Sequence, residues 1–128
     1  MPRDRKTATG TIFLDADSIV HAVNTVTREH TLEDAKENIR IVAEECAGVR
    51  RPLLVDMTIP AKQTAECRQY YASDEVAAIV TSVALLTPGM LSRVIGNLII
   101  GLSSLSVPMK LFNTKAEALA WLMAHRKA

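Results

Sequence analysis

Short apolar runs alternate with segments of helical periodicity along most of the chain. Residues 11–14 and 19–25 have the apolar–polar alternation of strands, and the Asp-Ala-Asp-Ser segment between them is typical of a turn. Apolar positions spaced for one helix face follow over 32–46, with Thr31 as an N-cap and Gly48 as a natural stop. The pattern predicts a hairpin, with strand 11–14 at the sheet edge, and then an amphipathic helix.

The second half of the chain predicts strand–helix pairs. Residues 53–57 form an apolar run interrupted only by its aspartate, which is typical of a strand covered on both faces, and a helix is expected over 61–73. The last strand ends at Phe112. Thr114 and Glu117 then have the spacing of a capping box, which predicts the final helix.

The segment between these pairs leaves two alternatives. Either Asp74 caps one or two further helical turns and residues 81–86 are the strand, or the strand covers 76–82. The first alternative is favoured because the apolar run then ends at Thr87-Pro88, an N-cap followed by proline at the first helical position.

Strands that alternate with helices predict a mostly parallel sheet in one α/β domain. We expect a flexible N-terminus over 1–9 and a single domain over 10–126, with a five-stranded mixed sheet and four helices. The strands that begin near Leu53, Ser82 and Met109 should lie side by side in parallel. A chain of 128 residues is long enough for one such domain, and its low aromatic content of 4% predicts an aliphatic core.

Composition excludes several function classes. Fifteen Lys and Arg against 14 Asp and Glu leave no basic surface for a nucleic acid or an anionic membrane. The most apolar window, residues 90–102, is too short for a membrane span and contains Arg93 and Asn97. The first ten residues are too polar for a signal peptide. We therefore expect a soluble cytoplasmic protein with no nucleic-acid partner and no membrane span.

The residues that usually carry catalysis do not form a motif here. Cys46 and Cys67 fall where a helix places small apolar residues, so we expect buried reduced thiols. The three histidines lack metal-ligand spacing, and no glycine-rich loop follows a strand. We predict no catalytic residue, no metal and no cofactor, and thus a protein that is not an enzyme.

One constellation of polar residues is a candidate site. Ligands of parallel α/β sheets favour the carboxyl ends of the strands, where helix N-termini attract anions. We therefore predict a site for a small anion or a phosphoryl group at five positions: Asp56, Thr58, Thr87, Asn113 and Thr114. The alternative is structural, with the two threonines Thr87 and Thr114 as helix caps and Asp56 bonded to loop amides.

A candidate association face lies on the helix after Thr87. Ile99 and Ile100 widen its apolar surface beyond a single stripe. Large exposed apolar patches usually mark association. We therefore predict a face for a homodimer or a protein partner here.

Four segments resemble a known family: residues 51–56, 92–97, 108–112 and 118–122. In their order and context they are similar to the SpoIIAA-like fold of STAS domains and anti-sigma-factor antagonists, especially to a bacterial family of small uncharacterised STAS/SpoIIAA-like proteins. The resemblance covers about residues 10–125. It implies a superhelical β–α arrangement with strands in sequential order, and a role in binding proteins or small molecules.

The resemblance also shows a departure. In anti-sigma antagonists a kinase phosphorylates a hydroxyl in an Asp-Ser-Ser-Gly-like run, whereas residues 56–64 here read Asp-Met-Thr-Ile-Pro-Ala-Lys-Gln-Thr. Only Thr58 and Thr64 offer a hydroxyl. We predict a non-enzymatic STAS-like interaction or regulatory module without the usual phosphorylatable serine. The alternative is a small-molecule or lipid carrier with a cavity beside residues 90–102.

Overall fold

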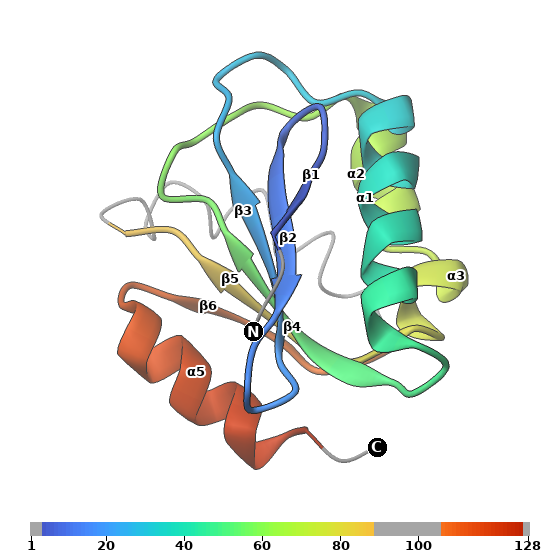
Figure 1. Cartoon of the computed structure of the whole chain (residues 1–128). Coiled ribbons are helices and arrows are strands. Elements are labelled where there is room, and N and C mark those ends of the chain that lie inside the picture. The colour runs from blue at the N-terminus through green and yellow to red at the C-terminus, as the bar shows by residue number, and fades with distance from the viewer. Residues whose placement is uncertain (1–3, 89–105, 127–128) are drawn as a thin grey trace.

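The computed structural model describes residues 4–88 and 106–126 (Figure 1). These residues form one six-stranded sheet in the order β1-β2-β3-β4-β5-β6. The strands are β1 (Arg5–Lys6), β2 (Gly10–Leu14), β3 (Val20–Asn24), β4 (Arg51–Asp56), β5 (Val80–Leu86) and β6 (Met109–Phe112). The helices are α1 (Leu32–Cys46), α2 (Ala65–Tyr71), α3 (Asp74–Ala77) and α5 (Lys115–Ala124).

The sheet is mostly parallel, as the alternation of strands and helices predicts. Strands β1, β2 and β3 pair antiparallel, and β3 to β6 pair parallel. Leu53 lies opposite Val83, and Val83 lies opposite Met109, so the three β-runs expected to be neighbours are confirmed as parallel neighbours.

The strand count differs from the prediction because β1 adds a sixth strand. Arg5 and Lys6 pair with β2, so β2 is not the sheet edge. The guanidinium of Arg5 holds β1 against α1 through ion pairs with Glu44 (2.6 Å) and Glu45 (3.1 Å). Two charged residues are too few to form the alternating pattern of a strand. The sequence also gives no indication of ion pairs between Arg5 and a helix about 40 residues away.

Helices cover both faces of the sheet, with α1, α2 and α3 on one side and α5 on the other (Figure 1). Under α1 lies an aliphatic cluster of Ile12, Val20, Ile41, Val42, Cys46, Leu53, Val80 and Val83. Under α5 lies a second cluster of Ile19, Leu54, Ala84, Leu86, Phe112, Ala118 and Leu122. Adjacent residues such as Leu53 and Leu54 enter opposite clusters, because successive side chains of a strand point to opposite faces.

The helix boundaries agree with the pattern at α1 and differ at α2. Thr31 caps α1 in a capping box, and the chain leaves the helix through Ala47 in the left-handed conformation (φ 54°). The helix predicted from residue 61 begins only at Ala65, because the backbone of Thr64 bonds to the His30 carbonyl and its hydroxyl caps α2 (3.2 Å to Cys67 N). The favoured alternative for the next segment is confirmed, since α3 precedes β5.

Candidate functional site

Three residues of the predicted anion site lie at one edge of the sheet. Asp56 at the end of β4 pairs with Leu86 of β5, and Leu86 pairs with Phe112 of β6. The Thr87 N–H donates to the carbonyl oxygen of Phe112 (3.0 Å). Asp56, Thr87 and Asn113 therefore follow one another at the edge where β3 to β6 end and their loops begin, which we call the carboxyl edge.

Two of these side chains lie on opposite faces of the sheet. Leu54 and Leu86 both pack in the cluster under α5. Strand alternation therefore places Asp56 on the α5 face and Thr87 on the α1 face. Thr87 is buried, and its Oγ1 has no hydrogen-bond partner among residues 4–88 and 106–126. The two side chains share an edge without converging on a single point.

The remaining hydroxyls of this set make local bonds. The N–H and the hydroxyl of Thr58 both donate to Asp56 Oδ1, at 3.0 and 2.6 Å. Thr114 Oγ1 accepts the Glu117 N–H (3.3 Å) and donates to Glu117 Oε1 (2.8 Å), which caps α5. The geometry matches the structural alternative for these residues, and anion binding at this edge stays a prediction.

The predicted association face is a different case. Ile99 and Ile100 lie outside the described residues, as does the segment 90–102 beside which a carrier cavity was expected. Cys46 and Cys67 are described, and both are free and buried as predicted.

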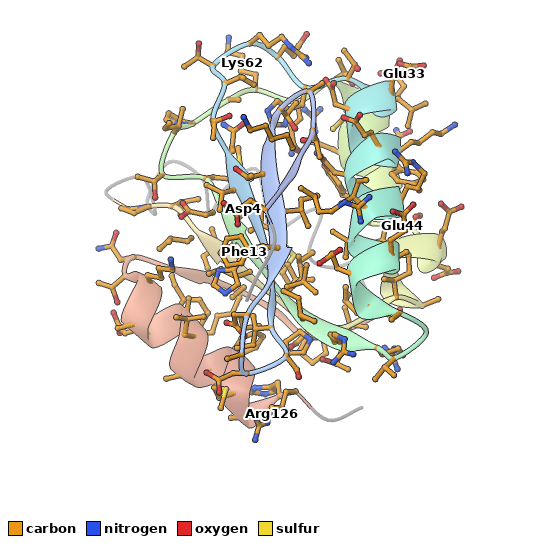
Figure 2. All side chains as sticks on the ribbon, viewed as in Figure 1. Asp4, Phe13, Glu33, Glu44, Lys62 and Arg126 are labelled. Atoms are coloured by element: carbon orange, nitrogen blue, oxygen red, sulfur yellow. The ribbon has the colours of Figure 1, made fainter. Side chains whose placement is uncertain are left out.

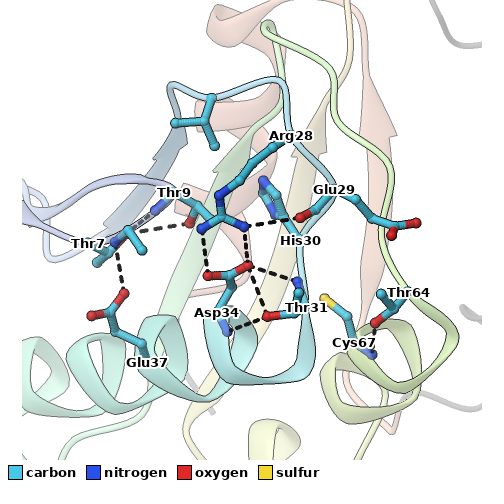
Figure 3. A network of polar contacts seen from close by, with 12 residues as sticks. Thr7, Thr9, Arg28, Glu29, His30, Thr31, Asp34, Glu37, Thr64 and Cys67 are labelled. Atoms are coloured by element: carbon cyan, nitrogen blue, oxygen red, sulfur yellow. Dashed lines mark hydrogen bonds and ion pairs between the residues drawn. The ribbon is translucent and has the colours of Figure 1, made fainter.

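The sequence pattern gave no sign of a buried polar cluster at the carboxyl edge. This polar cluster joins the end of β3, the loop that follows and the first turn of α1 (Figure 3). Asn24, His30 and Asp34 are each less than 8% exposed. We call Asn24, Arg28, His30, Thr31 and Asp34 the loop cluster. Residues of these types are common on protein surfaces, so the sequence alone does not indicate that they form a cluster.

Asp34 is the anionic centre of the loop cluster. Its carboxylate accepts two hydrogen bonds from the Arg28 guanidinium (2.7 and 2.9 Å) and one from the Thr31 N–H (2.8 Å). The hydrogen bonds from Arg28 hold the pKa of this carboxyl well below its usual range, against the opposing effect of burial. The Arg28 side chain is half exposed (49%), so the ion pair forms the outer surface of the cluster.

His30 connects two loops of the carboxyl edge. Its Nε2 lies 3.0 Å from Asn24 Oδ1, and the Asn24 amide group donates to the carbonyl oxygens of Val26 (2.8 Å) and Ile59 (2.6 Å). Because Oδ1 can only accept, His30 Nε2 carries the proton. Burial lowers the pKa of His30.

The backbone of His30 makes the same connection. Its N–H donates to the Lys62 carbonyl (2.9 Å), and its carbonyl accepts the Thr64 N–H (3.0 Å). The β3–α1 loop (25–31) and the β4–α2 loop (57–64) are thus joined by main-chain and side-chain bonds.

The neighbouring groups of α2 stay neutral at ordinary pH. Burial raises the pKa of Cys67 to about 11 and that of Tyr71 to about 12. The Tyr71 hydroxyl accepts a hydrogen bond from Asn38 Nδ2 (3.1 Å), which also donates to Thr9 Oγ1 (3.1 Å). A protonated buried thiol is a poor nucleophile.

A shallow groove of about 330 Å³ separates the two loops at the surface. Its walls are Thr27 and Glu29 from one loop and Pro60, Ala61 and Lys62 from the other. Ile59, next to Pro60, is 40% exposed and is one of two large exposed hydrophobic residues in the described ranges. The second is Val49 (55%), which follows α1 at the opposite end of β4.

A second buried histidine lies on the α5 face of the sheet. His21 Nε2 is 2.8 Å from Asp15 Oδ2, and the ring stacks on Phe13 at 4.5 Å between centroids. Figure 2 shows Phe13, which lies on β2, far from Lys62 at the carboxyl edge. His21 Nδ1 has no hydrogen-bond partner in the described parts of the chain. The pair fixes the β2–β3 turn, since Asp15 Oδ1 also accepts the N–H groups of Asp17 and Ile19.

Within residues 4–88 and 106–126, no group of three or more His, Cys, Asp or Glu side chains is arranged to hold a metal ion. None of the helices described is both long enough and apolar enough to cross a bilayer.

Comparisons with known proteins agree with the fold and name no activity. The chain matches an uncharacterized protein of the DUF3478 family from Shewanella loihica PV-4, described as having a SpoIIAA-like fold, with 15% identity, a TM-score of 0.58 and coverage of 95% of this chain and 92% of that one. A protein of unknown function from Arthrobacter sp. FB24 matches at 26% identity and a TM-score of 0.33, over 92% of this chain and 95% of that one. No curated protein matches.

The likeness to the Shewanella protein shows a SpoIIAA-like fold, as the sequence resemblance implied. One family covers nearly the whole chain, over residues 12–126. The protein is thus a member of the family described as "Domain of unknown function (DUF7793)".

Proposed function

We propose that this chain is a non-enzymatic, cytoplasmic interaction module of the STAS type, and that it contacts a protein partner through the β4–α2 loop. The SpoIIAA-like fold supports the class of module. The exposed position of Ile59 supports the choice of the β4–α2 loop as the contact surface. The proposal depends on this observation.

Ile59 lies exposed on a loop that is fixed at several points. Asn24 holds the Ile59 carbonyl, and His30 holds the backbone of Lys62 and Thr64. A fixed loop loses little conformational entropy on binding, so an apolar side chain on it can form a contact at low cost. The adjoining groove has room for one or two side chains of a partner.

The polar groups of this edge favour a scaffold role over catalysis. Asp34 is saturated by Arg28 and Thr31, and His30 donates to Asn24. A catalytic acid or base needs a free position toward a substrate, whereas these groups are bonded to the protein itself.

Paired surface variants test the proposal. Ile59→Asp should abolish capture of the partner protein that the wild-type chain captures from the native host, while Val49→Asp should leave that capture intact. Both residues are large, apolar and exposed, but they lie at opposite ends of β4. Each variant should keep the unfolding free energy within about 0.5 kcal/mol of the wild type, because neither side chain is in the core.

The oligomeric state decides which partner occupies the surface. Light scattering after size exclusion should give the same mass for wild type and Ile59→Asp if the partner is another protein. A dimer that Ile59→Asp alone dissociates would mean a second copy occupies the loop. Capture that survives Ile59→Asp, or that Val49→Asp disrupts equally, would contradict the proposed surface.

A further inference from the structure

We propose that His30 makes the β4–α2 loop acid-sensitive: protonation of its buried imidazole releases the loop from the end of β3. The consequence for binding rests on the proposed function, since this loop is the proposed contact surface. The opening itself is a property of the folded chain and can be measured without a partner.

The bonds that fix the loop converge on two residues. Asn24 Nδ2 holds Ile59 O at 2.6 Å, and Asn24 Oδ1 is oriented by His30 Nε2 at 3.0 Å. The backbone of His30 adds bonds to Lys62 and Thr64. The imidazole must therefore stay in its buried position for the loop to keep its own.

Burial opposes a second proton on the His30 ring, and the charged neighbours act in opposite directions. The Asp34 carboxylate, which is already bonded to Arg28 and Thr31, favours the imidazolium, whereas the Arg28 guanidinium disfavours it. From α2, Cys67 and Tyr71 face the cluster as neutral groups. At the loop surfaces Glu29 and Lys62 carry opposite charges. Burial is therefore the main cost of an imidazolium at this position.

The direction of the effect follows from linkage. In the closed loop the pKa of His30 lies below its ordinary value of about 6.5, because burial disfavours the charged ring. In the open loop the ring meets water and regains that ordinary value. The open state therefore binds protons more strongly, and its population rises as the pH falls through about 6.5, by at most about tenfold per pH unit.

Amide hydrogen exchange measures this opening. The N–H groups of His30 and Thr64 bond across the two loops and report it directly. Their protection factors, corrected for intrinsic exchange, should be constant above about pH 7.5. They should fall by up to about tenfold per pH unit below about pH 6.5. Amides in the paired centres of β4 and β5 should show no such change.

Two glutamine variants separate the cause. His30→Gln keeps a side-chain donor for Asn24 and cannot titrate, so it should remove the pH dependence at Thr64. His125→Gln is the control, because His125 bonds to the Trp121 carbonyl at the end of α5, away from both loops. It should leave the pH dependence unchanged.

Several results would overturn the proposal. The first is amide protection at His30 and Thr64 that does not change with pH while NMR shows the imidazole titrating. The second is an equal loss of protection in β4 and β5. The third is a pH dependence of protection that persists in His30→Gln. If His30→Gln does not fold, the wild-type titration decides: an imidazole midpoint at or above about 6.5 refutes the proposal. A missing partner for Ile59 would refute the proposed function and leave the exchange result standing.

Discussion

Replacing Asp34 by asparagine is the sharpest test of the loop cluster. The substitution keeps the size of the side chain and one acceptor oxygen, which can still bond to the Thr31 N–H. It removes the charge. In the wild type the carboxylate accepts two bonds from Arg28, at 2.7 and 2.9 Å, whereas the NH₂ group of the asparagine places a donor toward the same guanidinium. The variant therefore loses the ion pair with Arg28 and keeps the capping box.

The expected loss of unfolding free energy is about 2 kcal/mol. The negative charge at the N-terminus of α1 contributes about 0.3–1 kcal/mol. Arg28 is half exposed, so solvent screens its ion pair, which adds only the small contribution of a surface bridge. A poorly paired amide in a site only 7% exposed adds a penalty of about 1 kcal/mol.

Urea unfolding at several pH values is the assay, with Glu33→Gln as the matched control. Glu33 is exposed in the same helical turn, so its variant reports the charge–dipole contribution alone (Figure 2). Because the folded pKa of Asp34 is depressed, its stabilisation is present above the unfolded value of about 3.9 and is lost as the pH falls below it. The gap between wild type and Asp34→Asn should therefore narrow from pH 5 toward pH 3.

Two outcomes would refute this account of Asp34. A loss at pH 7 no greater than that of Glu33→Gln would mean that the Arg28–Asp34 ion pair contributes nothing to stability. A gap that is unchanged at pH 3 would mean that it does not depend on the ionised carboxylate.

Two further predictions concern α5 and the thiols. Thr114→Ala should lower the unfolding free energy by about 1 kcal/mol in urea, whereas Thr114→Ser should stay within a few tenths, because the hydroxyl caps α5; equal losses would argue against the cap. Burial raises the pKa of Cys46 and raises that of Cys67 to about 11, so an aromatic disulfide reagent should modify both thiols only after unfolding. Modification of the native protein at the rate of a free thiol would contradict the burial of either residue.

The fold was largely predictable because its signals are local. Strand 53–57, the Thr31 N-cap and the capping-box spacing of Thr114 each follow from a few neighbouring residues, and the structure confirms them. The errors arose where distant contacts decide the local structure. Arg5 is held in β1 by carboxylates about 40 residues away.

The candidate site was predictable only in part. The shared edge of Asp56, Thr87 and Asn113 followed from the parallel sheet, since parallel strands end together. The loop cluster was not predictable, because His30 and Asn24 look like ordinary loop and strand residues until Ile59 is folded against them. Their roles depend on pairing between two loops, for which no spacing rule exists.

Strand order that follows chain order has a consequence during synthesis. As the polypeptide leaves the ribosome, each new strand finds its neighbour already made, so the sheet can grow in one direction without waiting for a distant segment. The layer under α5 differs, because within residues 4–88 and 106–126 the helix that packs on Ile19, Leu54 and Ala84 is the last element to be synthesised. A nascent or truncated chain without α5 therefore lacks this cover and exposes more apolar surface to chaperones and to other copies of itself.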